Sequence, residues 1–171
     1  MPIRVSNPLR LHTLGQCLLS LSLVAGPTAL RANEAPQILP IEAEWRLPSG
    51  QIIQLEVADE RREQAIGLQL RDPLPPLRGM WFPFQDQLLR FWMHRTPAPL
   101  DMVFINDNRV IAIEANTVPC PRLPCRSYGP DSPGDGVVEL AAGEAARLGI
   151  TVGSSVRIRP LSPVPSKPGQ D

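Results

Sequence analysis

The segment from Gly79 to Asn106 constrains the fold more than any other part of this sequence. It contains six of the eight aromatic residues, set in short apolar runs that polar residues and prolines interrupt. Runs of this length and composition are typical of β-strands and too short for amphipathic helices. We therefore predict strands at Met80–Phe84, Leu88–Met93 and Met102–Asn106. Aromatic residues along such strands favour a β-sandwich core over a ligand-stacking surface, although an aromatic side chain exposed in a cleft would reverse that interpretation.

The remaining chain carries further strand signals and two short helix signals. Pro48-Ser49-Gly50 separates two alternating apolar runs, which indicates a β-hairpin. Asp59 is a candidate N-cap for a helix with its apolar stripe at 65–70, and an alanine-rich helix is expected at 142–148. The other expected strands are 42–47, 51–57, 109–115, 137–140 and 153–159, with a long irregular loop at 116–136. The sequence predicts a mainly β fold, a small domain resembling a β-sandwich, jelly roll or barrel, with two short helices.

Residues 1–32 have the order of a secretory signal. Arg4 and Arg10 precede an apolar run over residues 11–25, and small residues follow, with cleavage expected after Ala29 or Ala32. The run is short for a bilayer span, and its retention as an N-terminal anchor is the alternative. We expect a linker at 33–41, a single β-rich domain at 42–160 and a disordered, proline-rich tail at 161–171. The protein is thus expected in the periplasm or another extracytoplasmic compartment, without a stable membrane span after cleavage.

The charge of the chain predicts neither a nucleic-acid partner nor a membrane-surface partner. The chain has 17 basic and 17 acidic residues, and residues 1–32 contain three arginines and no acidic residue, so their removal leaves a net charge of −3. Nucleic-acid-binding domains usually carry a basic face, and binding to an anionic membrane needs a basic cluster. We expect a monomer.

Cysteine spacing indicates a local disulfide. Cys17 falls within the expected signal, so the exported chain retains Cys120 and Cys125. An even number of cysteines in an exported protein favours a disulfide, which would stabilise the fold by roughly 2 kcal/mol. A metal site that adds His94 to both cysteines is the alternative, but the spacing and the flanking prolines favour the disulfide. We predict no metal and no cofactor.

Three side chains could carry chemistry in such a domain. His94 lies in a polar break between apolar runs, and Asp101 follows after a proline-containing connection, so the two could face each other across neighbouring strands. That arrangement suits a base held by a carboxylate, but a hydrogen-bonded structural pair fits the same residues and is favoured. Glu139 interrupts the apolar run Val137–Leu140. A solvent-facing side chain is the ordinary interpretation there, whereas a buried carboxylate would be informative.

A series of short motifs occurs in a fixed order along the domain. Its positions are Gly67-Leu68, Arg71, Gly79-Met80, Phe82, Phe84, Phe91-Trp92-Met93, Thr96, Pro99-Leu100-Asp101, Phe104, Val138-Glu139-Leu140, Ala142-Gly143, Gly149-Ile150 and Gly153. In this order the motifs resemble an uncharacterised prokaryotic family, domain of unknown function 192, over about residues 50–158. The resemblance implies a small, mainly β domain, often behind a signal peptide, with no established activity and no catalytic residues to transfer.

This chain departs from that family pattern at two places. Relatives often read Met-Lys-Asn-Thr where this chain has Met93-His94-Arg95-Thr96, and they often have Met where this chain has Gln69. His94 is therefore not a family position. The resemblance centres a site on Arg71, Thr96 and Asp101.

Two functions remain open on these observations. The sequence contains no phosphate-binding glycine loop, no His-Glu-x-x-His motif and no serine nucleophile elbow. Their absence favours an exported, non-catalytic domain that binds a small ligand or an envelope partner. The alternative is a hydrolase-like enzyme that acts on an envelope substrate through Asp101 with His94 or Glu139. The candidate functional residues are Arg71, Thr96, Asp101, His94 and Glu139.

Overall fold

The computed structural model describes residues 35–161. The expected signal segment, its cleavage sites and its alternative as an anchor lie outside the described residues, and so do residues 162–171 of the expected tail. Within residues 35–161, no helix is long and apolar enough to cross a membrane.

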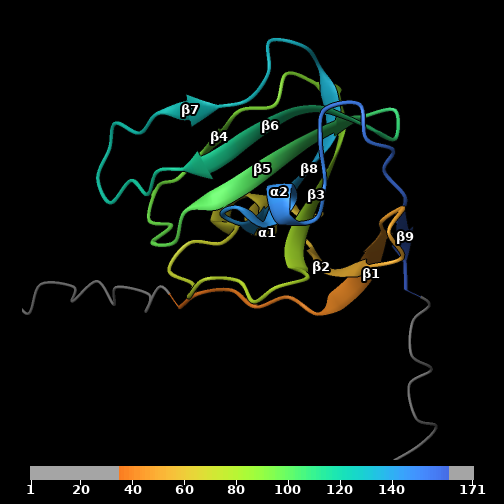
Figure 1. The fold of residues 1–171 in the computed structure, drawn as a ribbon. Coiled ribbons are helices and arrows are strands. Elements are labelled where there is room, and N and C mark those ends of the chain that lie inside the picture. Colours follow the sequence, from red (N-terminus) through yellow and green to blue (C-terminus); the bar gives the residue numbers. More distant parts are fainter. Residues whose placement is uncertain (1–34, 162–171) are drawn as a thin grey trace, which may run out of the picture. The chain divides into compact units, whose positions relative to one another are not determined.

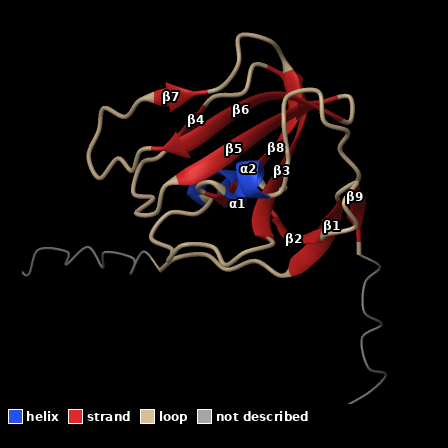
Figure 2. Ribbon diagram, viewed as in Figure 1, coloured by secondary structure: helices blue, strands red, loops and turns tan. Residues whose placement is uncertain are grey.

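Seven strands form one sheet, in the order β6-β5-β8-β3-β2-β1-β9 (Figure 1). The strands are β1 Ile41–Arg46, β2 Ile52–Val57, β3 Arg78–Gln87, β5 Leu100–Asn106, β6 Arg109–Thr117, β8 Gly134–Ala141 and β9 Ile158–Pro160. Neighbouring strands are antiparallel except β2 and β3, which are parallel because the segment that contains the first helix carries the chain back between them. Figure 2 shows strands predominating over two short helices, which confirms the predicted mainly β fold.

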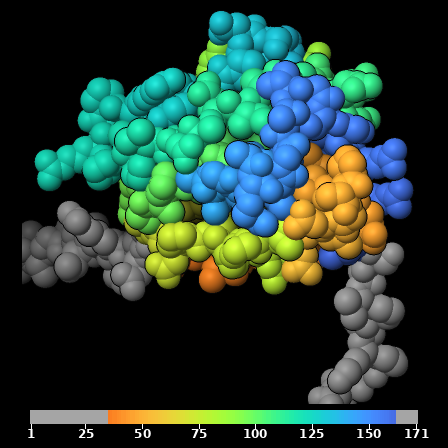
Figure 3. Space-filling view, viewed as in Figure 1, coloured from red at the N-terminus to blue at the C-terminus, as the bar shows by residue number. Residues whose placement is uncertain are grey.

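Each face of the sheet has its own apolar core, because side chains alternate along a strand. One core lies under α2 (Glu144–Arg147) and comprises chiefly Trp45, Ile53, Leu55, Val103, Ile105, Val138, Leu140, Ala145 and Leu148. The second core lies on the opposite face and comprises chiefly Leu68, Leu74, Met80, Phe82, Leu89, Met93, Met102, Phe104 and Val137. In the space-filling view, the surface of the α2 region lies beside that of the β1–β2 hairpin, as expected for elements that share the first core (Figure 3).

The second core is covered largely by irregular chain. We predicted a strand at Leu88–Met93, but only β4 (Phe91–Trp92) is paired there. Its partner is β7 (Ser127–Tyr128), which lies inside the region 116–136 that we predicted as a loop. Leu89 and Met93, on either side of β4, are both buried. A short apolar run does not distinguish a strand from a buried covering segment, so the prediction was wrong in its length.

The first helix begins one residue later than predicted and ends earlier. α1 spans Arg61–Ile66, with Glu60 rather than Asp59 as its N-cap, and the Glu63 carboxylate accepts the Glu60 N–H at 3.2 Å. Gly67 ends the helix at φ 50° and ψ −133°, a conformation that glycine adopts without strain. The helix therefore stops at this glycine, well before the prolines that we expected to end it.

The last predicted strand, 153–159, divides into two parts. Residues in its first part bond the start of β6, where Gly153 N–H donates to the Val110 carbonyl at 2.8 Å and Val110 N–H donates to the Ser154 carbonyl at 3.0 Å. Only β9 joins the sheet, beside β1. The chain thus passes from one edge strand of the sheet to the other without closing a barrel.

Candidate functional site

A pocket of about 200 Å³ lies over the second core. It is lined by α1 with the turn that follows it, by β3, by the segment around β4, and by β8. Its polar lining residues are Gln64, Gln69, Arg90, His94, Thr96 and Glu139, and its aromatic ones are Phe82, Phe84, Phe91 and Trp92. The fold therefore brings together three of the five candidate residues, His94, Thr96 and Glu139.

Glu139 lies in the middle of β8, opposite Met80 of β3 and Met102 of β5. Both methionines are fully buried, and Glu139 is 4% exposed. Its carboxyl has no hydrogen-bond or ion-pair partner within residues 35–161. Burial disfavours the charged form and raises the pKa of this carboxyl to about 8, so it is mostly protonated at pH 7. The solvent-facing interpretation of Glu139 is wrong, and the informative alternative, a buried acid, holds.

A glycine on the neighbouring strand lets β8 pack closely at Glu139. A Cβ atom at Gly79 would lie 2.9 Å from the Glu139 carbonyl oxygen and 3.0 Å from the Leu55 side chain. Since real Cβ atoms almost never approach so closely, a larger residue would push β3 away from β8 or β2. The glycine of the Gly79-Met80 motif is thus explained by the backbone that carries the buried acid.

Thr96 adds a hydroxyl to the pocket. The residue is 7% exposed, and its Oγ1 lies 3.4 Å from the His94 carbonyl oxygen, at the long end of the hydrogen-bond range. A hydroxyl held so weakly keeps its capacity to bond a ligand.

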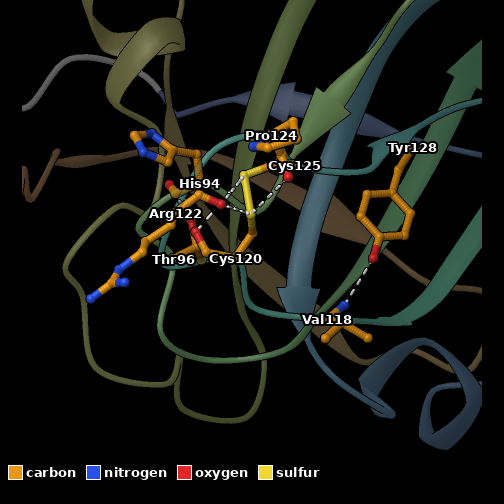
Figure 4. The surroundings of a disulfide bond; sticks show 8 residues. All are labelled: His94, Thr96, Val118, Cys120, Arg122, Pro124, Cys125 and Tyr128. Atoms are coloured by element: carbon orange, nitrogen blue, oxygen red, sulfur yellow. Dashed lines mark hydrogen bonds between the residues drawn. A yellow bond between two sulfur atoms is a disulfide. The ribbon is translucent and has the colours of Figure 1, made fainter.

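A disulfide loop holds the backbone of His94. Cys120 and Cys125 are bonded, with Cα atoms 5.8 Å apart, which confirms the predicted pairing. Cys120 N–H donates to the Met93 carbonyl and the Cys120 carbonyl accepts the Arg95 N–H, both at 3.0 Å. The loop therefore brackets His94, which Figure 4 shows beside the disulfide. The bonded sulfurs remove the ligands of the alternative metal site, and no group of three or more His, Cys, Asp or Glu in residues 35–161 is placed to hold a metal ion.

Aromatic rings form much of the pocket wall. Phe91 makes edge-to-face contacts with three other rings, at centroid distances of 5.2 Å to Phe82, 6.1 Å to Phe84 and 6.0 Å to Phe104. These contacts fix the rings in a well-packed cluster. Trp92 also lines the pocket, yet it is 54% exposed. The buried rings match the core interpretation, and Trp92 meets the condition that we set for ligand stacking.

Asp101 lies apart from the pocket lining and supports the fold. It is 1% exposed, its Oδ1 accepts the Asn116 N–H at 2.9 Å, and its Oδ2 accepts the Ala145 N–H at 3.0 Å. Both oxygens are therefore bonded to backbone, which ties β5 to β6 and to the first turn of α2. We expected that His94 and Asp101 could face each other across neighbouring strands. The strands β4, near His94, and β5, which contains Asp101, are not neighbours, because β4 pairs with β7 whereas β5 pairs with β6 and β8.

Arg71 is also placed outside the pocket lining. Its guanidinium makes a two-pronged ion pair with Glu56 of β2, at 2.6 and 2.8 Å, and both side chains are largely buried. The same carboxylate accepts the Leu39 N–H at 2.9 Å. The pair fastens the turn after α1 and the segment before β1 onto the sheet. Of the three residues on which the resemblance centred a site, only Thr96 lines the pocket.

Sequence reasoning missed the α1 side of the pocket. Gln64, Leu68 and Gln69 line it, and the Gln64 amide donates to the Pro83 carbonyl at 3.1 Å. The Gly67-Leu68 motif was the available signal. Only the tertiary fold shows that this turn lies over the same face of the sheet as Glu139.

A larger hollow lies along β1, β3 and β9, with a volume of about 790 Å³. Its lining includes Glu42, Asp59 and Asp135 but none of the five candidate residues. Asp135 accepts the Asp107 N–H at 2.9 Å and so has a structural partner. We place the site at the smaller pocket, because a buried acid without a partner lies only there among the described residues.

Residues 35–161 thus form a small β domain in which a buried acid without a side-chain partner lies beneath an aromatic wall. The chain belongs to the domain of unknown function 192 family, whose profile, described as "Uncharacterized ACR, COG1430", matches residues 45–158. No curated protein matches the sequence.

Two crystal structures resemble the fold. A protein of unknown function from Novosphingobium aromaticivorans DSM 12444 is 34% identical, with a TM-score of 0.61 over 73% of this chain and 94% of that chain. A protein from Sinorhizobium meliloti 1021, described as a "putative transcription regulator", is 28% identical, with a TM-score of 0.60 over 72% of this chain and 97% of that chain.

Proposed function

We propose that this protein is an exported, non-catalytic domain that binds a small ligand, or a small group of an envelope partner, in the pocket over Glu139. One observation carries the proposal: a buried carboxyl without a partner, 4% exposed, lines a pocket. Buried polar groups in folded proteins are almost always hydrogen-bonded, because burial without a partner costs free energy. A ligand that bonds Glu139 relieves that cost, which makes the pocket a binding site.

The remaining lining suits a ligand with an apolar body and a polar end. Phe82, Phe84 and Trp92 supply ring surface, whereas Thr96 and Glu139 supply hydrogen-bonding groups. Ligand pockets generally combine a mostly apolar wall with a few converging polar groups.

Fragment binding to the full chain tests the proposal. Cationic, neutral and anionic fragments are added in turn, and the NMR signals of the Gly67 and Thr96 amides and the Trp92 indole are followed. Fragments of at least one class should shift these signals. The variant Ala65→Phe places a ring at the exposed, pocket-lining Ala65 and should abolish the shifts. Arg62→Phe, on the same helix but outside the lining, is the matched control and should keep them. If no fragment shifts the pocket signals, the proposed function is wrong.

Export is the second part of the proposal, and it rests on the order of charge, apolar run and small residues in residues 1–32. Mass spectrometry of the protein from its native cell should find an N-terminus after Ala29 or Ala32 in the extracytoplasmic fraction. An intact Met1 on protein in the cytoplasmic fraction would contradict it.

The hydrolase-like alternative is favoured by one observation, that Glu139 and His94 line the same pocket. An acid whose pKa is raised to about 8 is suited to donate a proton near neutral pH. Asp101 does not contribute, since both of its oxygens accept backbone N–H groups. Turnover of ester or amide substrates that Glu139→Gln abolishes and Asp101→Asn preserves would favour this alternative over simple binding.

A further inference from the structure

We infer that the ligand group seated on Glu139 is a cation, an ammonium or guanidinium on a short apolar stem. This inference rests on the proposed function and specifies its ligand class. Two sources share this chemistry, a free small amine or guanidine and the lysine or arginine side chain of a peptide.

The charges of the lining leave Glu139 as the group that lacks a counter-charge. The charged or titratable residues of the lining are Arg90, His94 and Glu139. Arg90 is already engaged: its Nη2 bonds Asp131 Oδ1 at 2.8 Å, and its Nη1 donates to the carbonyl oxygens of Pro130 and, at 3.1 Å, Leu89. The carboxyl of Glu139 has no hydrogen-bond or ion-pair partner within residues 35–161. A buried carboxylate is stable only when paired, so a cation is the complement that the site lacks.

The aromatic wall favours a cation over an anion. Ring faces carry negative charge, and a cation within about 6 Å of a ring centroid is attracted by it. Phe82, Phe84, Phe91 and Trp92 all line the pocket, and Trp92 is 54% exposed. An anionic ligand would be repelled by the carboxylate of Glu139 and would gain no such attraction from the aromatic rings.

The volume limits how much of a ligand enters. About 200 Å³ is below the roughly 300–1,000 Å³ typical of pockets that enclose a drug-sized molecule. The pocket therefore takes a head group with a short stem. That size fits the end of a lysine or arginine side chain as well as a free amine.

The inference predicts how binding depends on pH. The pKa of Glu139 is raised to about 8 by burial, so a cation must displace the proton before it pairs with the carboxylate. The deprotonated fraction rises about tenfold between pH 7 and pH 9, and the apparent affinity for a permanently charged cation should rise by the same factor. The elements packed against Glu139 present Met80 on β3, Met102 on β5 and Gln64 and Gln69 near α1, none of which titrates, with Arg90 and His94 on the covering segment.

The test compares n-butylguanidinium with its neutral isostere n-butylurea. The full chain is titrated with each compound at pH 7 and pH 9, and the Trp92 indole signal is followed by NMR. The guanidinium should bind at least tenfold more tightly than the urea at pH 9, and about tenfold more tightly at pH 9 than at pH 7. Glu139→Gln should remove both differences. Asp86→Asn removes an exposed carboxylate of β3 outside the lining and should leave both in place.

Three outcomes separate the two proposals. Urea binding that equals or exceeds guanidinium binding, or guanidinium binding that does not tighten with pH, overturns the cation inference and leaves the pocket as a binding site. Binding of fragments of other classes, with no response to either compound, does the same. No response to any fragment overturns the proposed function itself.

A short glycine-flanked arginine peptide that binds more tightly than n-butylguanidinium supports a peptide side chain as the source, and weaker binding supports a free small cation.

Discussion

Replacement of Glu139 by glutamine should make the domain more stable at high pH. The carboxyl of Glu139 has an ordinary pKa of 4.5, and burial between Met80 and Met102 raises it to about 8 in the folded protein. The folded state therefore holds a proton between pH 4.5 and pH 8 that the unfolded state has lost. Stability falls with pH wherever the folded state binds more protons, so this residue costs stability as pH rises through that window and no more above it.

The magnitude follows from the size of the shift. A rise from 4.5 to about 8 corresponds to about 5 kcal/mol across the whole window, and about 3 kcal/mol of that is lost by pH 7. Glutamine has a similar shape and no charge, so Glu139→Gln removes this pH dependence. Folded domains have net stabilities of roughly 5–15 kcal/mol, so this change is a large share of the total and should be easy to measure.

Urea unfolding of both proteins at pH 4, 5, 6, 7, 8 and 9 measures the effect. The unfolding free energy of Glu139→Gln minus that of the wild type should be smallest at pH 4 and should rise by several kcal/mol towards pH 9. Glu144→Gln is the control of opposite sign, because the hydrogen bonds from Arg147 and from the Leu77 N–H hold the pKa of Glu144 below its usual value. That variant should lose stability, relative to wild type, as pH rises from 4 past the ordinary pKa of 4.5, and the difference should then stay constant up to pH 9. A difference for Glu139→Gln that stays constant from pH 4 to pH 9 would refute the reasoning.

Three further predictions concern the residues that support the site. Asp101→Asn should fold but lose roughly 1–3 kcal/mol of unfolding free energy at pH 7, because an amide NH₂ replaces one of two acceptors that face backbone N–H groups; an unchanged urea midpoint would argue against the structural role. Arg71→Met should cost about 3 kcal/mol, because it leaves the largely buried Glu56 carboxylate unpaired. Adding Glu56→Gln to that variant should recover part of the loss in the same assay, and a further, fully additive loss would contradict the pairing. The peptide that contains Cys120 and Cys125 should resist alkylation in denatured protein until a reductant is added, whereas immediate double alkylation would show free thiols.

The candidate site could be predicted only in part. His94, Thr96 and Glu139 were identified from residue chemistry and family motifs, and all three line the pocket. Asp101 and Arg71 were identified on the same grounds, yet their polar atoms are taken up by backbone N–H groups and by Glu56. A buried acid looks the same in a sequence whether it joins a structural network or faces a pocket. Only its partners distinguish the two roles.

The local features of this protein follow from its amino-acid sequence alone. Alternating apolar runs set the strands, turn residues set the β1–β2 and β5–β6 hairpins, and two cysteines a few residues apart set the disulfide, because each depends on neighbours in the chain. Features that depend on distant segments of the chain are set by the tertiary fold. It placed β8 between β3 and β5, which turned Glu139 from an ordinary polar interruption of a strand into a buried acid. It also placed α1 and the β4 segment over the same face of the sheet. The pocket exists because these two parts of the chain do not fill the space next to Glu139 and offer its carboxyl no partner.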